Sequence, residues 1–303
     1  MQTRFAFVKT VFFGNYFYGI CAVALSVEAA LQQHYPLNDW LYYVACFSAT
    51  VVFYTKAYIA DNKIFPANAR AGWYAQHRYA VSISQLILTI LVIGIALYLL
   101  LYNLKNISQT PVLTWFVAAS FPLAGIGYYG FSVGKKFSVN LRNAGWLKPF
   151  LIGFVWGGLV NVYPVIYYNI VHRTTFQIEP LNVWLFLKNF MFITVLCIMF
   201  DIKDYATDYN LKLKTFVVRV GLRKTIFLIL LPLCVLGLGS FLVYGFIHHF
   251  HPMKMIFNTI PFILLITVAY SMHQRKSILY YLAIIDGLML IKAICGSIAM
   301  IYF

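Results

Sequence analysis

The chain has 303 residues, of which 62% are hydrophobic, 18% are aromatic and only 10% are charged. Soluble globular domains carry about 25% charged residues, so this composition excludes an ordinary soluble protein and predicts an integral membrane protein. The 23 Lys and Arg residues outnumber the 8 Asp and Glu residues. In a membrane protein such an excess predicts cytoplasmic loops that face anionic lipid, and it does not favour nucleic acid as a partner.

Apolar stretches of span length recur along the whole chain and predict an all-α fold, a multi-span helical bundle with about nine transmembrane helices in the lipid bilayer. The connections between them are too short for an extramembrane catalytic domain, and no internal repeat is visible, so residues 1–303 are predicted to form a single integral membrane domain. The predicted spans, in chain order, are 10–31, 38–60, 80–104, 111–131, 147–171, 182–200, 225–247, 254–272 and 278–302.

The charge of the loops predicts the orientation of the bundle. An odd number of spans places the two termini on opposite sides of the membrane. The N-terminus and the loops after the even-numbered spans hold 17 Lys and Arg residues, whereas the alternate loops hold three, namely Lys105, Arg173 and Lys254. Because positive loops stay on the cytoplasmic side, we expect a protein of the cytoplasmic (inner) membrane with its N-terminus in the cytoplasm and its C-terminus outside.

The acidic residues divide by their predicted depth and side. Three at the predicted outer ends are expected to be solvated: Glu28, Asp39 and Glu179. Four gather on the predicted cytoplasmic side: Asp61, Asp201, Asp204 and Asp208. An unpaired charge at mid-bilayer costs about 2.5–3.5 kcal/mol, so Asp286, inside the last predicted span, is expected to pair across helices.

Asp201, Asp204 and Asp208 are spaced i, i+3 and i+7, which places them on one face of a helix. Three carboxylates on one face repel each other unless a cation lies between them. Oxygen ligands of this kind suit Mg²⁺, which takes one or two carboxylates together with water and phosphate oxygens. The alternative is a solvated acidic turn whose charge is offset by the neighbouring lysines, and the spacing alone fits both interpretations.

The segment from Phe200 to Gly221 resembles the second aspartate-rich motif of the UbiA family of intramembrane prenyltransferases. That motif has the form Asp-x-x-Asp-x-x-x-Asp, commonly followed by a Gly, a basic residue, Thr, an apolar run and Arg-x-Gly. The residues that match it without a gap are Asp201, Asp204, Asp208, Thr215, Arg219 and Gly221. Lys212 stands at the usual Gly position. The family is a nine-helix bundle with its motifs on the cytoplasmic side, so the resemblance extends to the predicted architecture.

The first motif of the family, Asn-Asp-x-x-Asp-x-x-x-Asp after the second span, is degenerate in this chain. Asp61 is its only remaining acid. The other motif positions are occupied by Ala60, Ile64 and Asn68. Asn68 still offers an amide oxygen, and Lys63 and Arg70 offer positive charge to a diphosphate.

The resemblance implies an enzyme that transfers a polyprenyl group from a prenyl diphosphate to a hydrophobic acceptor, aromatic or a quinone precursor, with Mg²⁺ as cofactor. The implied metal ligands are Asp201, Asp204, Asp208 and Asp61, of which Asp204 and Asp208 are also the implied catalytic residues. The implied diphosphate-binding residues are Lys135, Lys136, Arg142, Lys63, Arg70 and Asn68. An ordinary positive loop is the alternative for Lys135, Lys136 and Arg142.

Other interpretations stay open. The segment around Trp73 and Tyr74 is either a lid over the diphosphate or an amphipathic anchor at the level of the lipid headgroups. The lost acids of the first motif favour, as the main alternative function, a non-catalytic relative that binds a prenyl lipid or a partner protein. A transporter is the third candidate, but transporters place charge near the bilayer midplane, whereas these acids cluster at one face.

Overall fold

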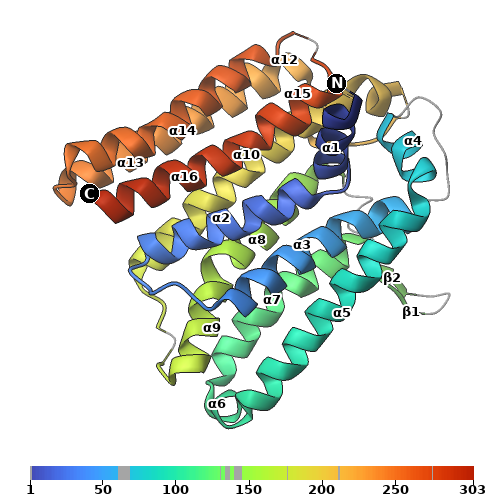
Figure 1. The fold of residues 1–303 in the computed structure, drawn as a ribbon. Helices are drawn as coiled ribbons and strands as arrows, with labels where there is room; N and C mark the ends of the chain where they lie inside the picture. Colours follow the sequence, from blue (N-terminus) through green and yellow to red (C-terminus); the bar gives the residue numbers. More distant parts are fainter. Residues whose placement is uncertain are drawn as a thin grey trace.

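The computed structural model describes residues 2–60, 69–129, 131–133, 137–139, 145–175, 177–210, 212–274 and 276–303. These residues form a bundle of helices with one short antiparallel hairpin, in which β1 (Phe131–Val133) pairs with β2 (Phe137–Val139) (Figure 1). The helices of the first half are α1 (Gln2–Phe13), α2 (Tyr16–Gln32), α3 (Trp40–Ala60), α4 (Ala69–Gln76), α5 (Arg78–Tyr102), α6 (Leu104–Gln109) and α7 (Val112–Tyr129). Those of the second half are η2 (Gly145–Leu147), α8 (Lys148–Gly157), η3 (Gly158–Val162), α9 (Tyr163–His172), α10 (Pro180–Asn210), α11 (Phe216–Val220), α12 (Leu222–Lys224), η4 (Thr225–Leu230), α13 (Leu231–Ile247), α14 (Pro252–Ser271), α15 (Ile278–Tyr280), η5 (Tyr281–Ile285) and α16 (Gly287–Tyr302).

The helical class predicted from the sequence is confirmed, and helix is present in each of the nine predicted stretches. The stretch 10–31 is divided by the bend between α1 and α2, and the stretch 111–131 extends beyond the end of α7. Within the described residues, six helical segments are long and apolar enough to cross a membrane: Arg78–Tyr102, Gly145–His172, Pro180–Asn210, Leu222–Ile247, Pro252–Ser271 and Tyr281–Tyr302. α1 and α2 meet at an angle of 65° and make a seventh if the bent pair is one span. These apolar helices indicate a lipid bilayer environment.

The helices run between two ends of the bundle. α1 and the C-terminal end of α16 lie at opposite ends (Figure 1). α5 lies at an edge of the bundle, where it packs mainly on α3. Only 6% of the residues in its most apolar stretch are buried inside the bundle. Its remaining surface is apolar, with Leu86, Ile87 and Ile90 more than half exposed. Such a surface is stable against lipid tails and unfavourable against water.

The core of the bundle forms around α10, which packs closely on α8. Met199 and Ile198 of α10 are almost completely buried, as are Leu25 of α2 and Leu288 of α16. The close approach of α8 and α10 depends on a glycine, because a Cβ atom at Gly153 would lie 2.9 Å from the carbonyl oxygen of Phe190. Small residues at such crossings let two membrane helices pack backbone to backbone.

Three segments of the bundle, η3, η4 and η5, are turns of π-helix inside longer helices. In η5 the backbone N–H of Asp286 donates to the carbonyl oxygen of Tyr281, five residues earlier, at 3.3 Å. A π turn holds one residue more than the α turn that it replaces and is enriched at functional positions. η3 contains the buried Asn161, and η5 ends directly before the buried Asp286.

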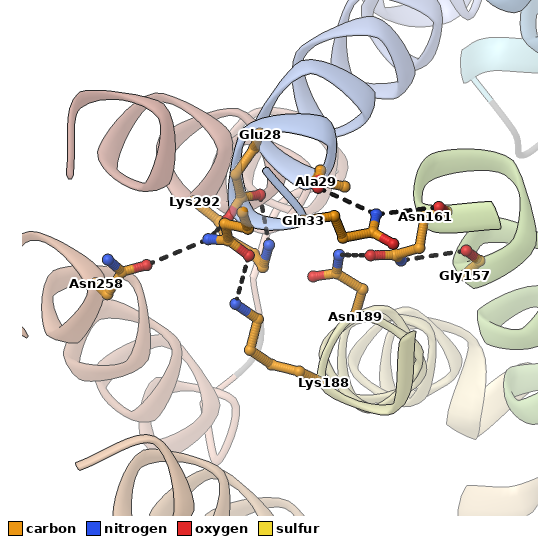
Figure 2. A network of polar contacts seen from close by, with 10 residues as sticks. Glu28, Ala29, Gln33, Gly157, Asn161, Lys188, Asn189, Asn258 and Lys292 are labelled. Carbon is orange, nitrogen blue, oxygen red and sulfur yellow. Dashed lines mark hydrogen bonds and ion pairs between the residues drawn. The ribbon is translucent and has the colours of Figure 1, made fainter. Parts of the chain in front are cut away.

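A polar network crosses the apolar core and corrects the expectation that Glu28 is solvated (Figure 2). Glu28 is 1% exposed, and its Oε2 pairs with the Nζ of Lys292 at 2.5 Å. The amide of Gln32 donates to Glu28 Oε1 at 2.9 Å, and the Nζ of Lys188 donates to Gln32 Oε1 at 2.8 Å. α2, α10 and α16 are therefore joined by charge-assisted hydrogen bonds in an environment where an unpaired charge is costly.

A second group of hydrogen bonds lies beside this one and joins amide side chains toward α8. Asn189 donates to the side-chain oxygen of Asn161 at 3.0 Å, and Gln33 donates to the backbone carbonyl of Asn161 at 3.1 Å. Asn161 in turn donates to the carbonyl of Gly157 at 3.1 Å (Figure 2). The π turn η3 thus places Asn161 where it contacts the side chain of Gln33, directly after α2, and that of Asn189 on α10.

Candidate functional site

The three acids Asp201, Asp204 and Asp208, called the acidic stripe below, all lie on α10. The Asp201 side chain is 2% exposed and that of Asp204 is 53% exposed, while Asp208 is half-buried. The charges of Asp204 and Asp201 act on the carboxyl of Asp208. The sequence spacing therefore predicted the shared helix, and the emergence of α10 from the core explains why the three exposures differ.

Asp201 is held by the first residue of α8. The Nζ of Lys148 donates to Asp201 Oδ1 at 2.8 Å. The other carboxylate oxygen, Oδ2, is buried and has no hydrogen-bond partner within the described ranges. A buried acceptor in this state costs about 1–3 kcal/mol, so Oδ2 is a position at which a further donor or a cation would be stabilised.

Asp204, the next acid of the stripe, has a weaker partner. Lys203 Nζ lies 3.3 Å from Asp204 Oδ2, in an exposed pair of the kind that contributes little to stability. Across the part of the chain that the structure describes, no three His, Cys, Asp or Glu side chains converge to hold a metal ion.

The segment after the stripe folds back over the start of α8. Thr215 precedes α11, and its hydroxyl is buried without a hydrogen-bond partner among the residues described. The guanidinium of Arg219 lies over the ring of Trp146, 5.5 Å from its centroid. A Cβ atom at Gly145 would lie 3.1 Å from the carbonyl oxygen of Lys214, so this return also depends on a close backbone approach.

Two positions after the stripe have backbone conformations that favour glycine. Gly221 has φ 90° at the junction between α11 and α12. Lys212, just after α10, has φ 56° in the left-handed region, and the N–H of the next residue, Leu213, donates to the carbonyl of Asp208 at 2.9 Å. This is the geometry of a helix C-terminus that glycine usually closes.

Replacing Lys212 with glycine is expected to raise the free energy of unfolding by roughly 0.5–1 kcal/mol, because the left-handed conformation costs a Cβ-bearing residue about 1–2 kcal/mol and glycine loses about 0.5–1 kcal/mol of extra chain entropy. Thermal unfolding in detergent, followed by tryptophan fluorescence, measures the change. Lys214→Gly is the matched control, since Lys214 has no positive φ, and it should be slightly destabilising. A loss of stability in both variants would contradict this explanation.

Arg70, predicted to bind diphosphate, is instead buried at the break between α1 and α2. It is 6% exposed, and its guanidinium donates to the carbonyl of Phe13 at 3.0 and 3.2 Å and to the side-chain oxygen of Asn15. Asn15 has φ 65°, a left-handed conformation that asparagine tolerates better than most residues. Arg70 therefore anchors the bend, and its role at a diphosphate stays a prediction.

Trp73 and Tyr74 are packed inside the bundle, which the two interpretations from sequence did not anticipate. They are 9% and 7% exposed and form a small cluster with Phe13, Val81 and Leu282. The hydroxyl of Tyr74 donates to the carbonyl of Phe13 at 2.8 Å. Burial raises the pKa of Tyr74 to about 12, so this hydroxyl remains a protonated donor throughout the physiological range.

The other predicted residues of this site lie outside the described residues: Asp61, Lys63, Asn68, Lys135, Lys136 and Arg142. Their positions relative to the acidic stripe remain predictions. Of the predicted set, the structure therefore brings together the three acids of the stripe on one helix and places Arg70 at the α1–α2 bend.

Two residues near the stripe were not identified as site residues from the sequence. Lys148 was counted only as a positive loop residue. Asp286 is 3% exposed, interacts with the side chain of Tyr18, and lies within reach of the charges of Arg70 and Lys203. The ion pair across helices that the sequence predicts for Asp286 stays a prediction. The sequence did contain a signal that could have identified Lys148 and Asp286. Both lie at the edge of, or inside, an apolar stretch, where an unpaired charge is unfavourable.

Comparisons with protein-family models, with curated proteins and with solved structures each found no match to this chain. The resemblance to the prenyltransferase motif therefore depends on the motif residues alone.

Proposed function

We propose that this chain is an intramembrane prenyltransferase-like protein of the UbiA type, which transfers a polyprenyl group from a prenyl diphosphate to an aromatic or quinone-precursor acceptor with Mg²⁺. The observation that carries the proposal is the acidic stripe at the end of α10, where a buried oxygen of Asp201 has no hydrogen-bond partner within the described residues. Carboxylates on one face of a helix, with a buried oxygen still without a partner, are suited to a divalent cation and the phosphate oxygens around it.

The positions that follow the stripe support the same proposal. In the family pattern a glycine stands where Lys212 lies, and Lys212 has the left-handed backbone that glycine adopts without strain. The glycine of Arg-x-Gly corresponds to Gly221, whose φ is 90°. The motif spacing thus agrees with the backbone conformation at both positions.

We further propose nine spans, with the N-terminus in the cytoplasm and the C-terminus outside the inner membrane. The six apolar segments and the bent α1–α2 pair give seven candidates. α3, with 21 residues, and α7, with 18, are the two further helices at predicted spans. The orientation is supported by the loop charge bias and by the positions of the chain ends at opposite ends of the bundle.

In the proposed reaction, Asp201, Asp204, Asp208 and Asp61 would hold Mg²⁺, which would supply Lewis-acid assistance to the departing diphosphate when bound. Lys135, Lys136, Arg142, Lys63, Arg70 and Asn68 are proposed to bind the diphosphate, and the positive members of this set neutralise its charge. Aromatic side chains exclude water and stabilise the allylic cation through their ring faces. The side chains that carry the chemistry are Asp204 and Asp208, the two more accessible acids of the stripe.

The test is binding of a fluorescent prenyl diphosphate to the purified protein in nanodiscs, with Mg²⁺ or with EDTA. We expect Mg²⁺-dependent binding that falls at least tenfold in Asp208→Asn and in Asp204→Asn, because each loses a charged oxygen ligand. Asp61→Asn should weaken binding less, since its motif retains a single acid. Glu179→Gln, an exposed acid away from the stripe, is the matched control and should bind normally.

A second candidate function is a non-catalytic relative that binds a prenyl lipid or a partner protein. The observation that favours it is the pairing of Asp201 with Lys148 at 2.8 Å, which already neutralises one acid of the stripe. This candidate predicts prenyl-ligand binding that is independent of Mg²⁺ and unchanged in Asp208→Asn. Single-turnover assays with candidate acceptors then separate the two functions, because only the enzyme releases diphosphate.

A further inference from the structure

A pocket of about 230 Å³ lies between α10, α13 and α14, away from the acidic stripe. It is lined by Lys188 of α10, which precedes Asp201 by thirteen residues on the same helix. At 1.5 Å per residue this separation is about 20 Å along the helix axis. The pocket is therefore distinct from the site proposed for Mg²⁺ and diphosphate, and it is smaller than the roughly 300–1,000 Å³ of pockets that enclose a whole drug-sized ligand.

The pocket contains more positive charge than its surroundings neutralise. Lys188 and Lys254 both line it, and in the part of the chain described neither has a carboxylate oxygen within 4.0 Å. The nearby carboxylate of Glu28 already accepts hydrogen bonds from Lys292 at 2.5 Å and from Gln32 at 2.9 Å (Figure 2). Two lysine amines thus face a partly apolar cavity without a counter-ion among these residues, and an incoming anion would stabilise their ammonium forms.

The other contacts of the two lysines hold them in place and leave donors available. Lys188 donates to Gln32 Oε1 at 2.8 Å and lies 5.5 Å from the ring centroid of Trp184. Lys254 lies 4.7 Å from the ring centroid of Phe250. An ammonium group has three donors, so each lysine retains N–H groups for a ligand. His248, which stacks on Tyr244 at 4.1 Å between ring centroids, adds an exposed imidazole to the lining.

Aromatic rings form the walls beside these charges. Trp184 stacks on Tyr244 with 4.4 Å between their ring centroids. Trp and Tyr are enriched at the level of lipid headgroups, where an apolar ring and a polar edge are both satisfied. A small cationic pocket with such walls fits a headgroup-sized anion more closely than a fully apolar ligand.

We propose that this pocket binds a phosphate group, carried either by an anionic lipid headgroup or by a soluble phosphate. The charge balance selects phosphate over a single carboxylate, because two lysines match a group that carries up to two negative charges. The donors are Lys188 and Lys254, with His248 at the opening, and the aromatic walls exclude water from the ion pairs.

The test uses the full chain and has two arms. In each arm, thermal unfolding reports stabilisation by the ligand, and native mass spectrometry reports which ligand stays bound. The first arm compares nanodiscs of phosphatidylcholine with nanodiscs that also contain phosphatidylglycerol. The second arm adds inorganic phosphate to the phosphatidylcholine nanodiscs. Retention of phosphatidylglycerol in the first arm alone identifies a lipid ligand, whereas stabilisation by phosphate in the second arm shows that the free anion suffices.

Lys188→Gln and Lys254→Gln are each expected to weaken binding in the responding arm by about tenfold or more, as expected for loss of a hydrogen bond to a charged group. Lys105→Gln is the matched control, since Lys105 is exposed on α6 and does not line the pocket. If Lys188→Gln does not fold, Lys254→Gln at the pocket wall is sufficient for the comparison. The proposal is overturned if neither arm shows a response beyond phosphatidylcholine, or if Lys105→Gln reduces the response as much as Lys254→Gln.

Discussion

Replacing Lys292 with methionine is expected to lower the free energy of unfolding by about 3–5 kcal/mol, the usual cost of removing one partner from a buried ion pair. Lys292 and Glu28 are 5% and 1% exposed, so water cannot solvate the carboxylate that remains. The amide of Gln32 still donates to Glu28, but it supplies no opposite charge. The apparent unfolding temperature in detergent should therefore fall by several degrees.

Two further variants separate the effect of charge from that of packing. Glu28→Gln combined with Lys292→Met removes both charges and should recover much of the lost stability, because the large cost comes from the uncompensated charge and not from the missing pair. Lys105→Met, at an exposed position, should change the free energy of unfolding by no more than about 0.5 kcal/mol. If the double variant is as unstable as Lys292→Met alone, loss of packing is the better explanation.

Arg70→Met is expected to destabilise the protein by about 2–4 kcal/mol, since it leaves the carbonyl of Phe13 and the side chain of Asn15 without charged donors in a buried position. Both groups lie at the bend that joins α1 to α2, so the bend loses its anchor. Arg70→Lys should restore only part of the stability, because a single ammonium group cannot reproduce the forked geometry of guanidinium. Thermal unfolding in detergent compares the stability of the unchanged protein, Arg70→Met and Arg70→Lys.

Arg78→Met is the matched control for this series, because Arg78 is exposed at the start of α5 and should contribute little. Binding of prenyl diphosphate to the same variants distinguishes the two roles of Arg70. A normal unfolding temperature combined with weaker diphosphate binding in Arg70→Met would show that this residue serves the ligand, and that the bend does not depend on it.

Local patterns in the sequence predicted the helices well, because the length of an apolar stretch can be determined from neighbouring residues alone. The stretch predicted at 80–104 corresponds to Arg78–Tyr102, and the spacing of Asp201 and Asp208 required the shared helix that α10 provides. The break between α1 and α2 also had a local signal, since the pair Gly14 and Asn15 interrupts an apolar run.

Pairings between distant helices could not be predicted in the same way. Glu28 and Lys292 are 264 positions apart, and their contact depends on how α2 packs against α16. Lys148 and Asp201 are 53 positions apart and meet because α8 lies along α10. The position of a charged residue in a predicted span indicates its depth in the membrane. Glu28 lies near the outer end of its predicted span, and depth alone therefore led to the wrong prediction that it is solvated. The rule that buried charges are paired would have required a partner for Lys292.

The π turns make the chain unequally sensitive to its exact length, because a π turn can lose one residue and a regular helix cannot. Each α-helical residue turns the chain by about 100°. If one residue were deleted from η5, the wider turn would close into an ordinary α turn, and the residues after it would keep nearly the same direction relative to the residues before it. A deletion between Gly287 and Lys292 in α16 has no wider turn to absorb it, so Lys292 would rotate by about that angle away from Glu28 while the apolar composition of the segment stayed almost the same. In this helix, register carries information that hydropathy does not, so a single deletion can be more damaging than several apolar substitutions.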